Sequence, residues 1–100
     1  MQKDETVSII RKHRAELELL GARHIALFGS VARGTESARS DVDVVVQLDD
    51  SIRGFKRIAS LDDLQNRLSQ ILACPVDVIE DQPRSEAVRK AIQRDAIRAF

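Results

Sequence analysis

The chain has 100 residues, 43% of them hydrophobic and only three aromatic, so we expect one domain over residues 1–100 with a single core of Leu, Ile, Val and Ala. Sixteen Lys and Arg balance sixteen Asp and Glu, and this zero net charge argues against a nucleic-acid binder and against a protein held on an anionic membrane. The single cysteine, Cys74, excludes an internal disulfide and a cysteine-based zinc cluster, and the lack of a signal-like start or a membrane-length apolar run predicts a cytoplasmic protein.

The first third of the chain predicts a helix followed by a strand. Apolar residues recur at helical spacing over residues 4–20, and Gly21 stands where a helix commonly stops. Residues 25–28 form a short apolar run that is typical of a buried strand. A turn follows, and a short helix is expected to begin over residues 31–33.

The middle of the chain predicts a strand, a loop and a long helix. Residues 41–48 alternate between apolar and mostly polar positions, which indicates a strand with one buried face. We expect a loop over residues 49–60 and a helix that starts at a capping signal at Ser60. The helix carries a leucine-rich stripe and ends before Pro75.

The last quarter predicts a third strand over residues 76–79 and a helix over residues 85–94, while residues 95–100 either extend that helix or form an edge strand. The first two strands are joined too closely for a crossover, so they should be antiparallel. The second and third are joined through a helix, so they should be parallel. The expected fold is α/β (α+β), a small mixed sheet with helices packed on one face.

Paired aspartates begin the second strand. Asp41 and Asp43 point to the same strand face, roughly 6–7 Å apart, where two carboxylates repel by about 2–3 kcal/mol at an effective dielectric near 20. Protonation of one carboxyl or a bound divalent cation would offset this repulsion. If Asp77 joins them, three carboxylates favour Mg²⁺. Asp-x-Asp alone is a weak signal, because two solvated aspartates on the wet face of a strand give the same pattern.

A glycine turn precedes these aspartates. Gly29 follows a strand and Ser30 can open a helix, so backbone N–H groups and the serine hydroxyl could face a phosphate. An ordinary strand-to-helix turn explains the same residues, and the chain contains neither the Walker nor the Rossmann glycine pattern. The combination is more informative, because such a turn would lie beside the carboxylates that begin the next strand.

The compound pattern resembles a known family. Its parts are Gly29-Ser30-x-Ala32-Arg33-Gly34, then Ser40-Asp41-x-Asp43, then a downstream strand with Asp77. It resembles the nucleotidyltransferase superfamily related to the DNA polymerase β palm, and the short chain is similar to the minimal branch of that superfamily. The resemblance implies that Gly29 and Ser30 hold the phosphates of the nucleotide. It also implies that Asp41, Asp43 and Asp77 bind two Mg²⁺ ions, with Arg33 contacting phosphate or forming a salt bridge.

The resemblance further implies a reaction and a partner. Minimal members resemble the antitoxins of toxin–antitoxin pairs, so the implied activity is transfer of AMP from ATP to a hydroxyl of a helical HEPN-type toxin, with tyrosine as the expected acceptor. The alternatives are a two-subunit enzyme that acts on a small molecule, and an antitoxin that acts by binding alone. The loop that contains Phe55 is expected near the site, where Phe55 contacts the base or covers the core.

Overall fold

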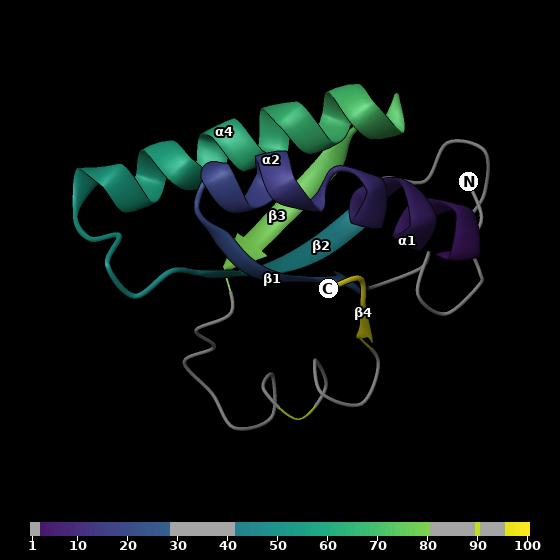
Figure 1. Cartoon of the computed structure of the whole chain (residues 1–100), viewed down its shortest axis with the longest axis horizontal. Coiled ribbons are helices and arrows are strands. Elements are labelled where there is room, and N and C mark those ends of the chain that lie inside the picture. Colours follow the sequence, from purple (N-terminus) through teal and green to yellow (C-terminus); the bar gives the residue numbers. More distant parts are fainter. Residues whose placement is uncertain (1–2, 29–41, 81–89, 91–95) are drawn as a thin grey trace.

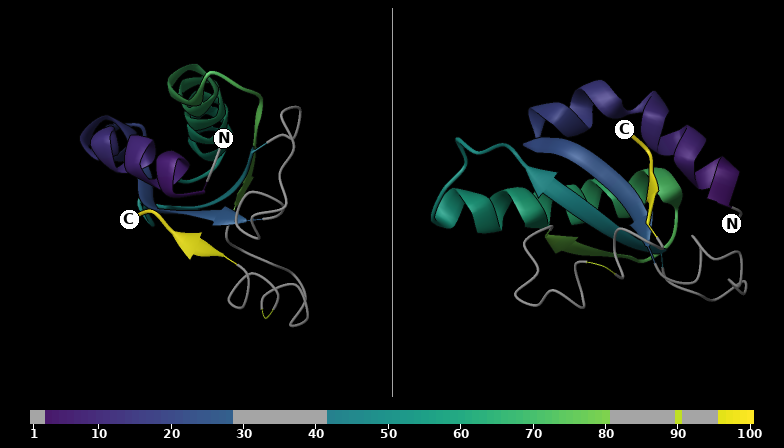
Figure 2. Two further views of the ribbon diagram at one scale, coloured as in Figure 1. Left: turned by 90° about the vertical axis from the view of Figure 1, so that its right-hand side faces the viewer. Right: turned by 90° about the horizontal axis from the view of Figure 1, so that it is seen from below.

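The computed structural model describes residues 3–28, 42–80, 90 and 96–100. The elements in chain order are α1 (Lys3–Lys12), α2 (Arg14–Leu19), β1 (Ala22–Phe28), β2 (Val42–Leu48), α4 (Phe55–Leu72), β3 (Val76–Glu80) and β4 (Ile97–Arg98). The strands form one sheet in the order β3-β2-β1-β4, and α1, α2 and α4 cover one face of it (Figures 1 and 2). The predicted α/β fold with a small mixed sheet is confirmed.

The strand directions also agree with the sequence-based expectation. β1 pairs with β2 in antiparallel fashion, and β2 pairs with β3 in parallel fashion. The short strand β4 adds to the free edge of β1 in antiparallel fashion, with Ala26 opposite Arg98. Of the two alternatives for residues 95–100, the edge strand is therefore confirmed.

The core lies between the sheet and the helices. The alternate valines of β2 point into it, and Val44 and Val46 have no exposed surface. Leucines spaced four residues apart on α4 pack against the same cluster, because residues at i and i+4 lie on one helix face. α1 contributes Ile10 and α2 contributes Leu17, both fully buried. The amphipathic spacing of each helix therefore decides which side faces the sheet.

The predicted helix over residues 4–20 is divided in two, which is a correction. His13 separates α1 from α2 with φ of −101° and ψ of 14°, outside the regular helix, and its ring Nδ1 donates to the backbone oxygen of Ile9 at 2.9 Å. The apolar spacing continues through this break, so periodicity alone does not reveal it. Gly21 follows α2 as predicted, with φ of +111°.

The predicted loop over residues 49–60 is too long, because α4 begins at Phe55. Gly54 precedes the helix with φ of +64°, and the proposed start at Ser60 is wrong. The first turn of α4 contains exposed apolar residues, with Phe55 90% and Ile58 66% exposed. No buried stripe marks this turn in the sequence, which explains the error.

Two predicted helical segments lie wholly or mostly outside the described residues, at 31–33 and at 85–94. The third predicted strand is confirmed, one residue longer than expected, as β3. Within the described ranges, no helix combines the length and the apolar character that crossing a bilayer requires.

Candidate active site

Two aspartates lie opposite each other on neighbouring strands. Asp43 is the second residue of β2 and Asp77 is the second residue of β3, and the parallel pairing of the strands aligns Asp43 with Asp77. Adjacent strands lie about 5 Å apart, and directly opposed residues project to the same face. β2 and β3 run side by side in Figure 2. The two carboxylates therefore share one end of one sheet face.

Burial of the flanking valines explains why both aspartates face away from the helices. Val42 and Val44 on either side of Asp43 are almost fully buried in the core, as is Val76 beside Asp77. Successive side chains of a strand point to opposite faces, so both carboxylates project to the free sheet face, which is the face that α1, α2 and α4 do not cover. Asp43 is half-buried there and Asp77 is exposed.

Apolar residues border the carboxylate pair on the same face. Phe28, the last residue of β1, pairs with Asp43 on the side opposite β3. Two residues further along the strands, Val45 pairs with Ile79, which is 44% exposed. The sequence analysis did not single out Phe28 or Ile79. The signal that could have found Ile79 is its even spacing from Asp77, which places both side chains on one face.

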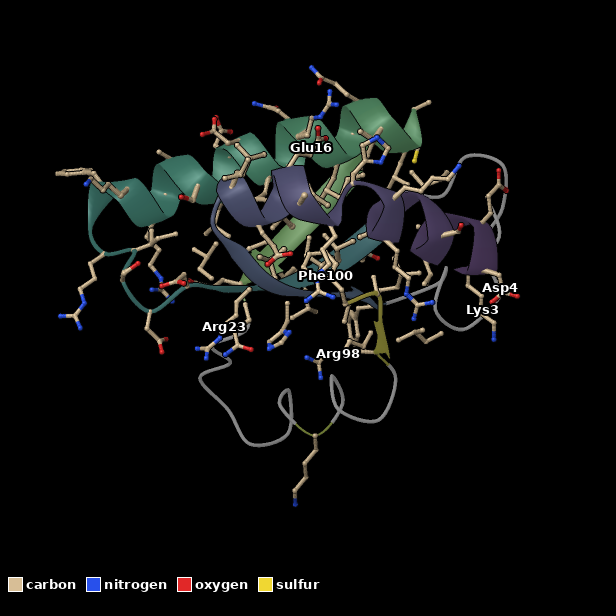
Figure 3. All side chains as sticks on the ribbon, in the orientation of Figure 1. Lys3, Asp4, Glu16, Arg23, Arg98 and Phe100 are labelled. Carbon is tan, nitrogen blue, oxygen red and sulfur yellow. The ribbon has the colours of Figure 1, made fainter. Side chains whose placement is uncertain are left out.

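A cation lies on the same sheet face at the opposite edge. Arg98 of β4 pairs with Ala26 of β1, and its guanidinium donates to the Nδ1 atom of His24 at 2.6 Å. Figure 3 shows Arg98 on the side of the sheet away from the helices. The free face thus carries carboxylates on β2 and β3 and a guanidinium on β4.

The structure describes only part of the predicted site. Four predicted site residues lie outside the described part of the chain: Gly29, Ser30, Arg33 and Asp41. The described residues include Phe28, which precedes the predicted glycine turn, and Val42, which lies between the two predicted aspartates. Among the residues that are described, no three His, Cys, Asp or Glu side chains form a metal-binding group. Asp43 and Asp77 supply two of the three predicted carboxylates.

Phe55 lies away from the carboxylates, contrary to the expectation that its loop borders the site. β2 runs from Asp43 toward Leu48, and α4 begins after that far end of the strand. Figure 1 shows the first turn of α4 and the first residues of β2 at opposite ends of the molecule. Because Phe55 is 90% exposed, it does not cover the core either.

Hydrogen bonds shift pKa values at two places away from the carboxylate pair. The hydrogen bond from Arg67 lowers the pKa of the Glu16 carboxyl, and the same bond raises the pKa of Arg67. The backbone N–H and the hydroxyl of Ser51 lower the pKa of Asp49 in the turn after β2. The first contact links α2 to α4, and the second lies within the turn after β2.

Comparison with known sequences settles the family. A family model for the nucleotidyltransferase domain matches residues 7–100. The chain belongs to this family. A relative from Methanocaldococcus jannaschii, provisionally named a protein adenylyltransferase, is 36% identical over 95 residues that cover 93% of each chain. The protein adenylyltransferase MntA of Thermococcus cleftensis is 30% identical over 95 residues, which cover 94% of this chain and 92% of MntA. The sequence-based resemblance is confirmed, and the chain is a nucleotidyltransferase.

Solved structures agree with this assignment. A structure provisionally described as a minimal nucleotidyltransferase matches with a TM-score of 0.77 and 28% identity, over 97% of this chain and 95% of that chain. The complex of a tri-AMPylated HEPN toxin with MNT antitoxin from Shewanella oneidensis contains a chain that matches with a TM-score of 0.61 and 16% identity, over 94% of this chain and 71% of that chain. The second likeness concerns the fold alone.

Proposed function

We propose that this nucleotidyltransferase is the antitoxin of a toxin–antitoxin pair, and that it transfers AMP from ATP to a tyrosine hydroxyl of a HEPN-type toxin. The observation that carries the proposal is the alignment of Asp43 with Asp77 on the free sheet face of a nucleotidyltransferase. The protein adenylyltransferase name of MntA and the AMPylated toxin in the Shewanella complex support the choice of reaction and partner.

The carboxylates fit a divalent cation. Asp43 and Asp77 bring two oxygen ligands to one position in the register of adjacent strands, and hard cations such as Mg²⁺ prefer oxygen ligands. We assign Asp41, Asp43 and Asp77 as the ligands of two Mg²⁺ ions. When bound, such ions neutralise charge on the triphosphate and stabilise the attacking and leaving oxygens.

The protein residues divide the remaining tasks. Gly29 and Ser30 bind the phosphates of ATP, and Arg33 contacts them. The acceptor hydroxyl attacks the α-phosphorus, and its proton passes to Asp77 and then to water. The bond between the α-phosphorus and the oxygen bridging to the β-phosphate breaks, and pyrophosphate leaves with that oxygen. The toxin then carries AMP on its tyrosine and is neutralised.

The test is a transfer assay. The purified chain is incubated with α-labelled ATP, Mg²⁺ and the protein that its neighbouring gene encodes, and mass spectrometry locates the label. We expect AMP on a tyrosine of that protein, and no transfer without Mg²⁺. The double variant Asp43→Asn/Asp77→Asn should lose transfer. The matched control is Asp62→Asn/Asp63→Asn, which changes two exposed aspartates of α4 and should keep it.

Other outcomes point to the alternatives. Label on a small molecule would favour the two-subunit enzyme, and neutralisation without any label would favour an antitoxin that acts by binding alone. Full transfer by the double variant would refute the assignment of the carboxylates. We also expect a single domain, a cytoplasmic location and no direct contact with nucleic acid or membrane.

A further inference from the structure

Ile79 is an exposed apolar residue beside the carboxylate pair. It follows Asp77 by two residues on β3, so both side chains project to the free sheet face. It is 44% exposed, whereas its register partner Val45 is buried. Leu19, Phe55 and Ile58 are also exposed, but they belong to α2 and α4 on the other side of the sheet. Ile79 therefore provides exposed apolar surface on the face that carries the carboxylates.

The strand order indicates which substrate reaches Ile79. β3 forms one edge of the sheet and β2 separates it from β1. The glycine-serine turn assigned to the phosphates follows β1, while Asp77, assigned to the acceptor proton, lies on β3. The nucleotide phosphates thus belong to the β1 side of Asp43, and the acceptor belongs to the β3 side.

We infer that Ile79 is a specificity-determining residue that packs against the aromatic ring of the acceptor tyrosine. This inference rests on the proposed function, since it concerns the acceptor of that reaction. Two residues along a strand span about 7 Å, which is comparable to the length of a phenol side chain. A tyrosine can therefore place its ring on Ile79 and its hydroxyl at Asp77.

This arrangement selects an aromatic hydroxyl over an aliphatic one. A tyrosine has a large apolar body and a polar tip, so it gains apolar contact with Ile79 while its oxygen stays among carboxylates. A serine or threonine hydroxyl near Asp77 leaves Ile79 uncovered and gains no such contact. Loss of this contact should therefore weaken binding of the acceptor and leave binding of ATP unchanged.

The experiment compares charged and conservative substitutions in the transfer assay. Ile79→Lys should raise the KM for the acceptor protein by about tenfold, with the KM for ATP unchanged within about twofold. Ile79→Val, which keeps a branched apolar side chain, should have a KM for the acceptor protein close to that of the wild type. Ile58→Lys is the matched control, because it adds the same charge at an exposed isoleucine of α4, and it should leave both KM values unchanged.

The outcomes separate this inference from the proposed function. No transfer to the protein acceptor by the wild-type chain would remove the proposed function, and the inference with it. Normal transfer by the wild type together with an unchanged acceptor KM in Ile79→Lys would overturn the inference alone. A rise in the KM for ATP in place of the acceptor KM would also overturn it, because Ile79 would then contact the nucleotide.

Discussion

Asp43 and Asp77 occupy the same register position on two parallel strands, so two carboxylates face each other across one strand spacing. Like charges in direct cross-strand contact destabilise a sheet. We propose that a cation bound by this nucleotidyltransferase offsets the repulsion between the two carboxylates.

The charge pair makes a prediction about stability. Without Mg²⁺, Asp77→Asn should leave the free energy of unfolding unchanged or raise it by up to about 1 kcal/mol, because it removes repulsion. Mg²⁺ should raise the melting temperature of the wild-type chain, since a ligand that binds only the folded state stabilises it. This increase should shrink in Asp77→Asn and persist in Asp62→Asn. An equal increase in all three proteins would contradict the metal assignment.

The contact between α2 and α4 predicts a pH dependence. Arg67 binds Glu16 through two nitrogens, at 2.5 and 3.2 Å, and lowers the pKa of Glu16 below its usual 4.5. A carboxyl with a lowered folded-state pKa stabilises the protein above its unfolded pKa, and this contribution is lost as the pH falls through the folded pKa. Figure 3 shows Glu16 in the helix layer.

The measurement is thermal unfolding of the wild type and of Glu16→Gln at several pH values. The wild type should be more stable by a constant amount well above pH 4.5, and the difference should vanish progressively below that pH. Glu18→Gln is the control on the same helix, where Glu18 pairs with Arg14. A difference that is constant down to strongly acidic pH would contradict the assignment to Glu16.

Gly21 predicts a backbone effect at the junction of α2 and β1. Its φ of +111° is rarely adopted by L residues, and a Cβ added there would lie 2.5 Å from Cδ1 of Ile52. The Ile52 atom is the end of a flexible side chain and can move, so the backbone strain decides the cost. Gly21→Ala should cost about 1–3 kcal/mol in the free energy of unfolding, measured with denaturant.

Gly54 is the matched comparison for that substitution. Its φ is +64° and its ψ is −136°, a combination outside the left-handed helical region, and a Cβ there meets no atom within 4 Å. Gly54→Ala should therefore cost the backbone strain alone, and Gly21→Ala should cost at least as much, because it also displaces the Ile52 side chain. A smaller cost for Gly21→Ala than for Gly54→Ala would contradict this reading of the Ile52 contact.

An ion pair between Arg57 and Glu80 links the first turn of α4 to the last residue of β3. The Oε1 atom of Glu80 is shielded from solvent, so removal of the guanidinium leaves a poorly solvated charge. Arg57→Met should cost about 1–3 kcal/mol in the free energy of unfolding. The double variant Arg57→Met/Glu80→Met should recover part of this loss, because it removes the unpaired charge as well. Additive losses in this double-mutant cycle would show that the two side chains do not interact.

Sequence periodicity predicts the parts of the fold that bury apolar side chains. The alternating valines of β2 and the leucine stripe of α4 each have one buried side, and both elements were predicted. The break at His13 and the exposed first turn at Phe55 bury no matching apolar residue, so the pattern contains no signal for them. Element boundaries set by backbone geometry are therefore harder to predict than the elements themselves.

The sequence predicts only part of the arrangement of the described site residues. The spacing of the aspartates fixes their face, and the helix between the strands predicts parallel pairing, but neither fixes the register that aligns Asp43 with Asp77. That register belongs to the tertiary structure, which local sequence patterns do not determine. The neighbour Ile79 was missed because its spacing from Asp77 indicates the sheet face that it shares but does not indicate that its side chain is exposed.

The crossover through α4 has a consequence for the newly made protein. Asp43 and Asp77 are separated by a whole helix in the sequence and meet only after β3 has docked beside β2. A chain that has left the ribosome only as far as α4 carries half of the acidic pair and cannot assemble the centre. Pairing of distant strands is also a slow step in folding. If the partner is a toxin, its inhibition after a pause in synthesis resumes only when new chains have been completed beyond β3.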